Sequence, residues 1–80
     1  MSTLKLTRIR RKPDYYRNDA PAWVRNVWPR PESFDWFIKH RRAELVQSGA
    51  VVRLGRDYFV DSMVFPKVAA RLLGMGREPE

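Results

Sequence analysis

The sequence predicts one small α+β domain that is mostly helical, and three patterns along its 80 residues support this prediction. Apolar residues recur at helical spacing over residues 32–48 and again over residues 62–73. Between them, residues 51–60 contain two β-prone runs separated by a Gly-Arg pair, which is typical of a hairpin. Because an isolated two-stranded hairpin is barely stable in water, we expect it to pack against the helices.

The N-terminal segment, residues 1–19, begins with a basic run. Residues 1–12 contain five Lys or Arg and no acidic residue. Leu4 and Leu6 alternate with polar residues, but the alternation fails at Arg8. Two interpretations therefore stay open: a short edge strand, or a solvated arm that becomes ordered only on an anion. We assign residues 1–19 to a basic arm outside the domain.

A short helix is predicted over residues 20–28. Asp19 is a suitable N-cap, and Pro21 is tolerated in the first turn. Pro29 and Pro31 end the helix, because a proline disfavours the α conformation of the residue before it. The apolar residues at helical spacing are Trp23, Val24, Val27 and Trp28. We expect Trp23 and Trp28 to lie in the core, since aromatic side chains supply much of the buried area of a small domain.

The strongest helical pattern covers residues 32–48. Ser33 is a capping residue, and Gly49 is a suitable residue to end the helix. One face carries an apolar stripe with a single basic member: Phe34, Phe37, Ile38, Arg41 and Leu45. Trp36 lies on the opposite face, and we expect it to pack against the hairpin or the short helix. Contact with a sugar-phosphate backbone and a place in a subunit interface are the alternatives.

The hairpin joins residues 51–54 to residues 57–60 through Gly55 and Arg56, with glycine at the first turn position, as a type II′ turn prefers. Asp61 or Ser62 is expected to cap the last helix, residues 62–73, and Gly74 to end it. Its predicted buried stripe is Phe65, Val68, Ala69 and Leu72. Residues 75–80 are expected to form a flexible tail.

This order of elements predicts a winged helix-turn-helix domain over residues 20–74. Two helices joined by a turn of about four residues form a helix-turn-helix motif, and a hairpin directly after the second helix is a wing. The chain therefore divides into a basic arm, this domain and the tail.

The balance of charge favours a nucleic-acid partner. The formal net charge is +7, the sequence pI is about 10.6, and most of the sixteen basic residues are arginine. A domain pI above about 9 is typical of nucleic-acid binders, and arginine matches phosphate and guanine edges better than lysine does. The alternative is that the charge only maintains solubility.

Other function classes find little support in the sequence. The chain has no cysteine and one histidine, so we expect no metal and no cofactor. No serine has a convincing base and no glycine-rich phosphate loop is present, so we expect no enzyme activity. No apolar run approaches the length of a membrane span, and the N-terminus lacks the apolar core of a secretory signal. We therefore expect a cytoplasmic protein without membrane contact.

Three segments, WPRPESFDWFIKHRRAEL, AVVRLGRDYFVD and the following helix with Phe65, resemble the winged-helix proteins of the excisionase class. These share their fold with the DNA-binding domains of mercury-resistance-type (MerR-type) regulators. The resemblance covers residues 20–73 and differs in two respects. Glu32 and Asp35 stand where the class is often basic; such carboxylates either accept from cytosine N4 or cap the helix, and we expect capping. The first helix is short and contains Pro21.

The resemblance implies sequence-specific binding to double-stranded DNA. It implies one or both of two roles in a phage or mobile element. The first is that of an excisionase, a recombination directionality factor that steers an integrase or recombinase. The second is that of a transcriptional repressor. The host would be bacterial, with the protein at the nucleoid, and self-association on DNA is a further expectation.

The candidate DNA contacts come from the long helix, the wing and the arm. Lys39 and Arg42 lie one turn apart on an exposed flank of the predicted helix. Arg56 is at the hairpin tip, while Arg53 either contacts DNA or pairs with Asp57. Arm cations would enter a minor groove. The full set is Arg8, Arg10, Arg11, Lys12, Arg30, Trp36, Lys39, His40, Arg42, Arg53, Arg56 and Tyr58.

Two other functions stay open. In the first, the chain is a small phage or plasmid protein that inhibits or redirects a host protein through exposed aromatic anchors, Tyr15, Tyr16 and Trp36. RNA binding comes after it, because the sequence lacks a sheet with aromatic residues for stacking unpaired bases.

Overall fold

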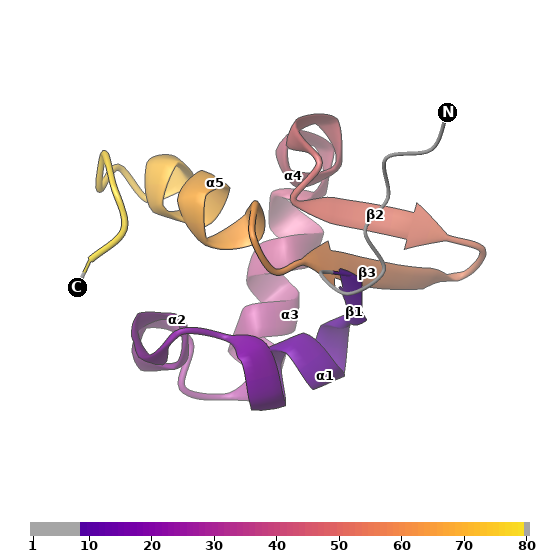
Figure 1. Ribbon diagram of the computed structural model, residues 1–80, viewed down its shortest axis with the longest axis horizontal. Coiled ribbons are helices and arrows are strands. Elements are labelled where there is room, and N and C mark those ends of the chain that lie inside the picture. The colour runs from indigo at the N-terminus through magenta and orange to yellow at the C-terminus, as the bar shows by residue number, and fades with distance from the viewer. Residues whose placement is uncertain (1–8, 80) are drawn as a thin grey trace.

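The computed structural model describes residues 9–79, which form a three-stranded antiparallel sheet, five α-helices and one π-helical turn (Figure 1). The α+β class with mostly helical content is confirmed. In chain order the elements are β1 (Ile9–Arg11), α1 (Lys12–Asp14), the π-helical turn η1 (Tyr15–Asp19), α2 (Ala22–Val27), α3 (Pro31–His40), α4 (Arg42–Ser48), β2 (Val51–Leu54), β3 (Asp57–Asp61) and α5 (Phe65–Leu72).

The predicted hairpin is confirmed and gains a third strand. The strand order is β1-β3-β2, and in the hairpin Val51 lies opposite Val60 and Arg53 opposite Tyr58. Gly55 has φ +67°, and within residues 9–79 only glycines have positive φ, as a type II′ turn requires. The turn lies at the end of the molecule opposite α5 (Figure 1).

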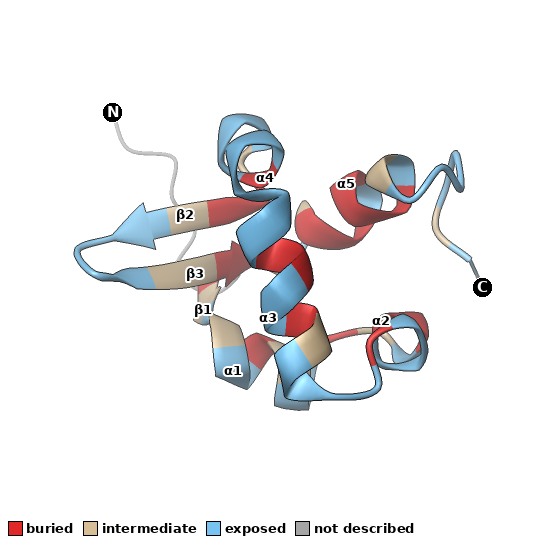
Figure 2. Cartoon of the chain, turned by 180° about the vertical axis from the view of Figure 1, so that it is seen from behind, coloured by how far each residue is buried: buried red, intermediate tan, exposed pale blue. Residues whose placement is uncertain are grey.

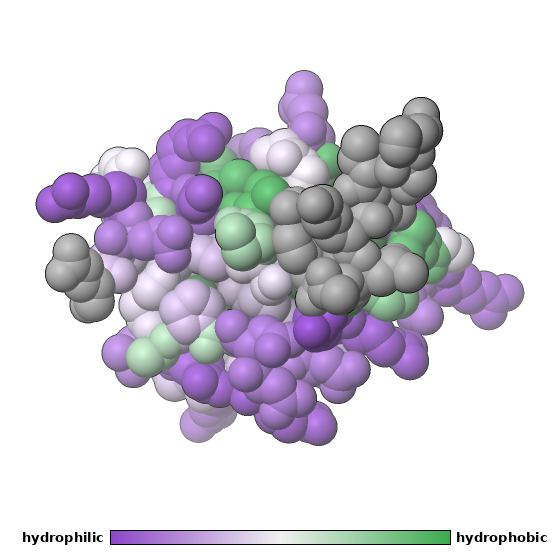
Figure 3. All heavy atoms as spheres, in the orientation of Figure 1, coloured by the Kyte–Doolittle hydropathy of each residue, from purple (hydrophilic) through white to green (hydrophobic). Residues whose placement is uncertain are grey.

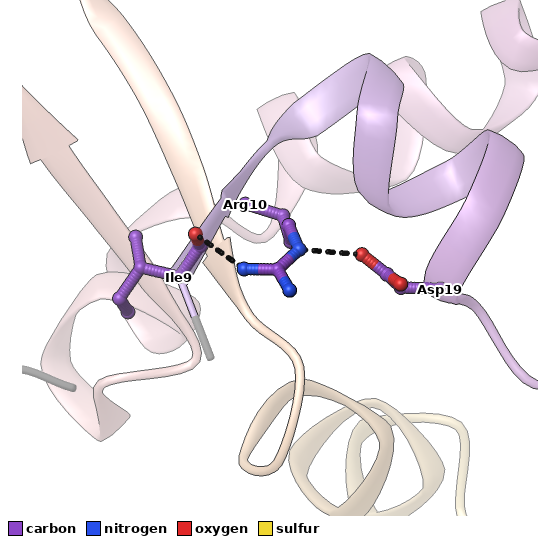
Figure 4. A network of polar contacts seen from close by, with 3 residues as sticks. All are labelled: Ile9, Arg10 and Asp19. Atoms are coloured by element: carbon purple, nitrogen blue, oxygen red, sulfur yellow. Dashed lines mark hydrogen bonds and ion pairs between the residues drawn. The ribbon is translucent and has the colours of Figure 1, made fainter. Parts of the chain in front are cut away.

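The assignment of residues 1–19 to an arm is wrong for residues 9–19, while residues 1–8 lie outside the described part. β1 pairs with β3 as an edge strand, which matches the other interpretation of this segment. Tyr15 is fully buried between Phe34 and Phe65, with ring centroids 6.1 and 5.5 Å away. Arg10 Nε lies 2.9 Å from Asp19 Oδ2, linking β1 to the end of η1 (Figure 4). This segment therefore belongs to the folded domain.

The first two predicted helices exist, but both begin differently. Helix α2 starts after Pro21 rather than after Asp19, whose carboxylate pairs with Arg10 instead. Helix α3 starts at Pro31, two residues before the predicted cap Ser33. As the third residue of the helix, Ser33 donates its hydroxyl hydrogen to the Arg30 carbonyl at 2.8 Å. A proline suits the first turn because its missing N–H has no partner there anyway.

The predicted continuous helix over residues 32–48 is interrupted at Arg41. Its backbone has φ −114° and ψ 23°, although the Arg41 N–H still bonds the Phe37 carbonyl at 2.9 Å. No glycine or proline causes this break. It leaves the one basic residue of the apolar stripe exposed, while Leu45 on α4 is completely buried. Gly49 ends α4 with φ +85°, as expected.

Helix α5 begins at Phe65, three residues later than predicted, after a turn anchored by Asp61. The buried Asp61 Oδ1 accepts hydrogen bonds from the N–H groups of Met63 and Val64, at 2.9 and 3.2 Å. The end at Gly74 is confirmed, with φ +79°. Of the predicted stripe, only Leu72 stays partly exposed.

Helix α3 lies in the centre of the molecule, with the sheet on one side and α2 and α5 on the other (Figures 1 and 2). Its buried face meets a cluster of aromatic rings, including Trp28, whose centroid is 4.5 Å from that of Phe37. Trp23 and Trp28 lie in the core, as predicted. No helix within residues 9–79 is long and apolar enough to cross a membrane.

Candidate nucleic-acid interface

Basic side chains from four separate elements gather around Tyr58 on β3. We call this group the Tyr58 cluster; its members are Lys12, Asp35, Lys39, Arg42, Arg53 and Tyr58. It contains four cations and one carboxylate, so its formal charge is +3. The cluster lies where α1, α3 and α4 meet the hairpin.

Tyr58 is the centre of the cluster because two guanidinium groups are held against it. Arg42, the first residue of α4, donates from Nη1 to the Tyr58 hydroxyl oxygen at 2.8 Å. The Cζ atoms of Arg42 and Arg53 lie 5.7 and 5.9 Å from the Tyr58 ring centroid, within the range of a cation–π interaction. Arg53 reaches the ring because it lies directly opposite Tyr58 in the hairpin.

The lysines complete the cluster on the side of α3. Lys12 Nζ lies 3.3 Å from Asp35 Oδ1, so one cation is neutralised locally. Lys39 lines the same small hollow as Lys12, Arg42 and Tyr58. Lys39 forms no ion pair within the described chain, which leaves its charge available to an external anion.

A wider groove runs between α4 and the hairpin, with a volume of about 500 Å³. Its cationic side chains are Arg42 at the start of α4 and Arg53 on β2, and Tyr58 on β3 lies with them. The uncharged residues Ala43, Val46 and Gln47 of α4 line the rest of the groove, and we call them its α4 wall. Among residues 9–79, no carboxylate lines this groove. The α4 wall was missed from the sequence, although its residues lie within about one and a half turns of Arg42.

The remaining predicted residues of the helix and wing are less closely grouped. Arg56 is exposed at the hairpin tip, beyond Arg53, where hydrophilic side chains project from the molecule (Figure 3). Arg30 is also exposed, but at the N-terminal end of α3, about 13 Å along the helix from Lys39. Arg53 forms no ion pair with Asp57: it donates from Nε to the Gly55 carbonyl, and the Asp57 carboxylate lies 3.4 Å from Arg11 Nη2.

Three of the four basic residues predicted to contact DNA from a free arm belong to the folded domain. Arg10, Arg11 and Lys12 each have a carboxylate partner, and all three belong to β1 or α1. Contact of these residues with a minor groove therefore stays a prediction, although they lie in a strand and a helix rather than in a free arm. Lys12 joins the Tyr58 cluster, and Arg8 lies outside the described residues.

Trp36 does not pack against the hairpin or the short helix. Its side chain is 60% exposed and stacks on the His40 ring, with centroids 3.7 Å apart. His40 Nδ1 lies 3.0 Å from the Trp36 carbonyl oxygen, so this nitrogen carries the hydrogen and Nε2 faces away from that bond. The pair forms an exposed aromatic platform on α3, next in sequence to Lys39.

Two of the three aromatic anchors proposed for a protein partner, Tyr15 and Tyr16, make their contacts inside the fold. Tyr15 is completely buried, so this assignment is wrong for that residue. The Tyr16 hydroxyl donates to the Trp28 carbonyl, and its ring packs on Phe34 with centroids 5.0 Å apart. Tyr16 does line a separate groove of about 420 Å³ with Pro13, Arg17 and Pro31, which the sequence did not suggest.

Comparisons of the chain with protein-family models, with curated proteins and with solved structures found no match in any of the three. The excisionase-like interpretation of the sequence therefore stays a prediction. Within residues 9–79, no group of three His, Asp or Glu side chains is placed to hold a metal ion.

Proposed function

We propose that this protein binds double-stranded DNA as a winged-helix protein of the excisionase type, using the Tyr58 cluster and the hairpin tip. The proposal rests on four cations from distant parts of the chain that converge around Tyr58: Lys12, Lys39, Arg42 and Arg53. Only one carboxylate of the cluster, that of Asp35, lies among them. Such a concentration of cations is unfavourable in isolation and becomes favourable when phosphates replace the counterions.

In this proposal α3 and α4 face the major groove and the hairpin flanks the DNA backbone, the usual arrangement of a helix-turn-helix with a wing. The order α2, turn, α3, α4 and hairpin supports it, with α4 continuing the second helix beyond the break at Arg41. Trp36 and His40 lie on the exposed face of α3 and are available for base or sugar contacts. The role as an excision factor or repressor of a mobile element, with an integrase as partner, rests on the sequence resemblance.

Charge reversal at two exposed cations tests the proposal. Lys39→Glu combined with Arg56→Glu is expected to lower affinity for a mixed-sequence duplex by about 100-fold or more, because two phosphate contacts become repulsive. Neither side chain forms an ion pair within residues 9–79, so the thermal midpoint should stay unchanged. Fluorescence anisotropy and circular dichroism measure the two quantities.

The matched control carries the same change of charge at the opposite end of the molecule. Lys67→Glu with Arg77→Glu alters an exposed residue of α5 and one beyond it, far from the hairpin tip (Figures 1 and 2). We expect less than about a fivefold loss, since screening limits the reach of surface charges to roughly 8 Å at physiological salt. Equal losses in the two double variants contradict a defined binding face.

The second candidate function is binding to a protein partner, and the exposed Trp36 platform favours it. Binding assays with duplex DNA and with a protein partner distinguish the two functions. If the wild-type chain fails to bind duplex DNA at low salt but retains one protein partner through Trp36, as judged by loss of binding in Trp36→Ala, the DNA proposal is wrong.

A further inference from the structure

We infer that the groove between α4 and the hairpin holds one nucleotide of the DNA backbone, with its phosphate on the Tyr58 hydroxyl and the guanidinium groups of Arg42 and Arg53. The sugar of that nucleotide would lie against Ala43 and Val46. This inference rests on the proposed function and specifies where and how a single phosphate is bound.

The hydroxyl of Tyr58 is prepared to donate a hydrogen bond. Its oxygen accepts from Arg42 Nη1 at 2.8 Å, so its own hydrogen points elsewhere and has no acceptor within the described chain. A hydroxyl that accepts from a cation becomes a stronger donor, because successive hydrogen bonds polarise one another. A phosphate oxygen is the acceptor that suits such a group, since charge-assisted bonds are the stronger ones.

The two guanidinium groups are held in position before any ligand arrives. Arg42 is fixed by its bond to Tyr58, and Arg53 donates from Nε to the Gly55 carbonyl at 3.2 Å. Each arginine has five N–H donors, so both keep unused donors directed away from these bonds. Because little side-chain freedom is left to lose, binding an anion here costs less entropy than binding at free surface arginines.

The size and lining of the groove indicate more than a bare phosphate. Its volume of about 500 Å³ exceeds that of a phosphate, and its α4 wall is apolar at Ala43 and Val46, with Val46 43% exposed. A sugar-phosphate unit fits this combination, because the sugar carbons can cover the apolar wall. The absence of any carboxylate among the groove's lining residues removes the repulsion that an anion meets elsewhere on the surface.

The test compares two tyrosines that each lose only a hydroxyl. Tyr58→Phe keeps the ring near both arginines but removes the donor, and we expect about a tenfold loss of affinity for a mixed-sequence duplex of about 20 base pairs. Tyr16→Phe is the control, because its hydroxyl bonds the Trp28 carbonyl away from this groove. It should leave DNA affinity unchanged, even where it lowers the thermal midpoint.

The dependence of affinity on salt separates a phosphate contact from a structural effect. Tyr58→Phe should leave the slope of log K against log salt unchanged between about 50 and 200 mM, because no charge is lost. Arg53→Gln should reduce the slope by about 0.9, and Arg53→Lys should restore it. A lysine cannot reproduce the guanidinium fork, so Arg53→Lys should still bind more weakly than wild type.

Each outcome decides between the two proposals. If wild type binds the duplex and Tyr58→Phe binds equally well, or if Arg53→Gln leaves the slope unchanged, the phosphate site is wrong while the proposed function stands. If wild type does not bind the duplex at low salt, the proposed function is wrong and the phosphate site is wrong with it.

Discussion

Tyr15 shows how a single residue connects the N-terminal segment to the centre of the molecule. Its ring is completely buried and touches Phe34 and Phe65, while its hydroxyl oxygen has no hydrogen-bond partner among the described residues. Burial raises the pKa of the Tyr15 phenol well above its ordinary value, and the carboxylates of Glu78 and Asp19 raise the pKa further. The neutral phenol is therefore the form compatible with folding.

This raised pKa predicts a loss of stability at alkaline pH. The unfolded chain releases the Tyr15 proton near pH 10, whereas the folded chain retains it, so the free energy of unfolding falls as pH rises above about 10, by up to about 1.4 kcal/mol per pH unit. Tyr15→Phe should be nearly neutral or stabilising at pH 7, since it removes an unsatisfied hydroxyl.

Urea unfolding of wild type and Tyr15→Phe at pH 7 and at pH 10 to 11 measures this effect. The difference between the two proteins should widen with pH, because Tyr15→Phe lacks the titrating group. Tyr16→Phe provides the comparison, since Tyr16 is only partly buried. Parallel curves for wild type and Tyr15→Phe at all pH values contradict a buried, neutral Tyr15.

At the scale of elements, connections decide how the helices and strands are oriented. The turn between β3 and α5 is held by Asp61, whose carboxylate accepts from the backbone N–H groups of Met63 and Val64, the two residues just before α5. The break between α3 and α4 is held by packing, because Leu45 on α4 is buried while Arg41 at the break is exposed. Arg42 then starts α4 at the position from which it reaches Tyr58.

Removal of the Asp61 carboxylate should destabilise the domain through this turn. Asp61→Ala leaves the Met63 N–H without its acceptor and the Val64 N–H with only the Asp61 backbone carbonyl, 3.2 Å away. We expect a loss of about 1 to 3 kcal/mol in the free energy of unfolding. Asp61→Asn keeps an acceptor oxygen and should lose less. Chemical denaturation measures both, and a loss for Asp61→Ala no larger than that for Asp61→Asn shows that the carboxylate does not hold the turn.

For the whole molecule, residues 9–19 complete both the sheet and the core. β1 covers one edge of β3, the ion pair of Arg10 with Asp19 links β1 to η1, and Tyr15 fills the space between α3 and α5. Tyr15 belongs to the core cluster of residues 9–79, which in so small a domain is modest, so the loss of one large member is costly.

Deletion of residues 1–19 should therefore abolish cooperative folding at 25 °C. The loss of one large aromatic residue from a core costs about 3 to 5 kcal/mol, which is a large part of the stability of a small domain. Deletion of residues 1–8 is the matched control, because it leaves every contact among residues 9–79 in place. Thermal unfolding followed by circular dichroism distinguishes the two deletion variants. A cooperative transition in the variant that lacks residues 1–19 contradicts a structural role for residues 9–19.

Features with a local cause were predictable from the sequence. The helix ends at Gly49 and Gly74, the turn at Gly55 and the apolar stripe of α3 all follow from residues within a few positions of one another. The candidate site was predicted as a list of cations, because composition and helical spacing identify basic residues on an exposed flank. Helical spacing could not predict which of these cations would form ion pairs with carboxylates inside the folded chain.

What the sequence determined by itself is the class of fold, the order of the elements after residue 20 apart from the break at Arg41, and the excess of positive charge, since each depends on short-range pattern or on composition. Only the tertiary structure decided that residues 9–19 enter the fold, that Trp36 stays exposed, and that Lys12, Arg42 and Arg53 meet at Tyr58. These outcomes depend on contacts between residues far apart in the chain, such as Arg42 with Tyr58 and Tyr15 with Phe65. The physical reason is that burial and ion pairing are settled by the whole packed molecule, which no local pattern contains.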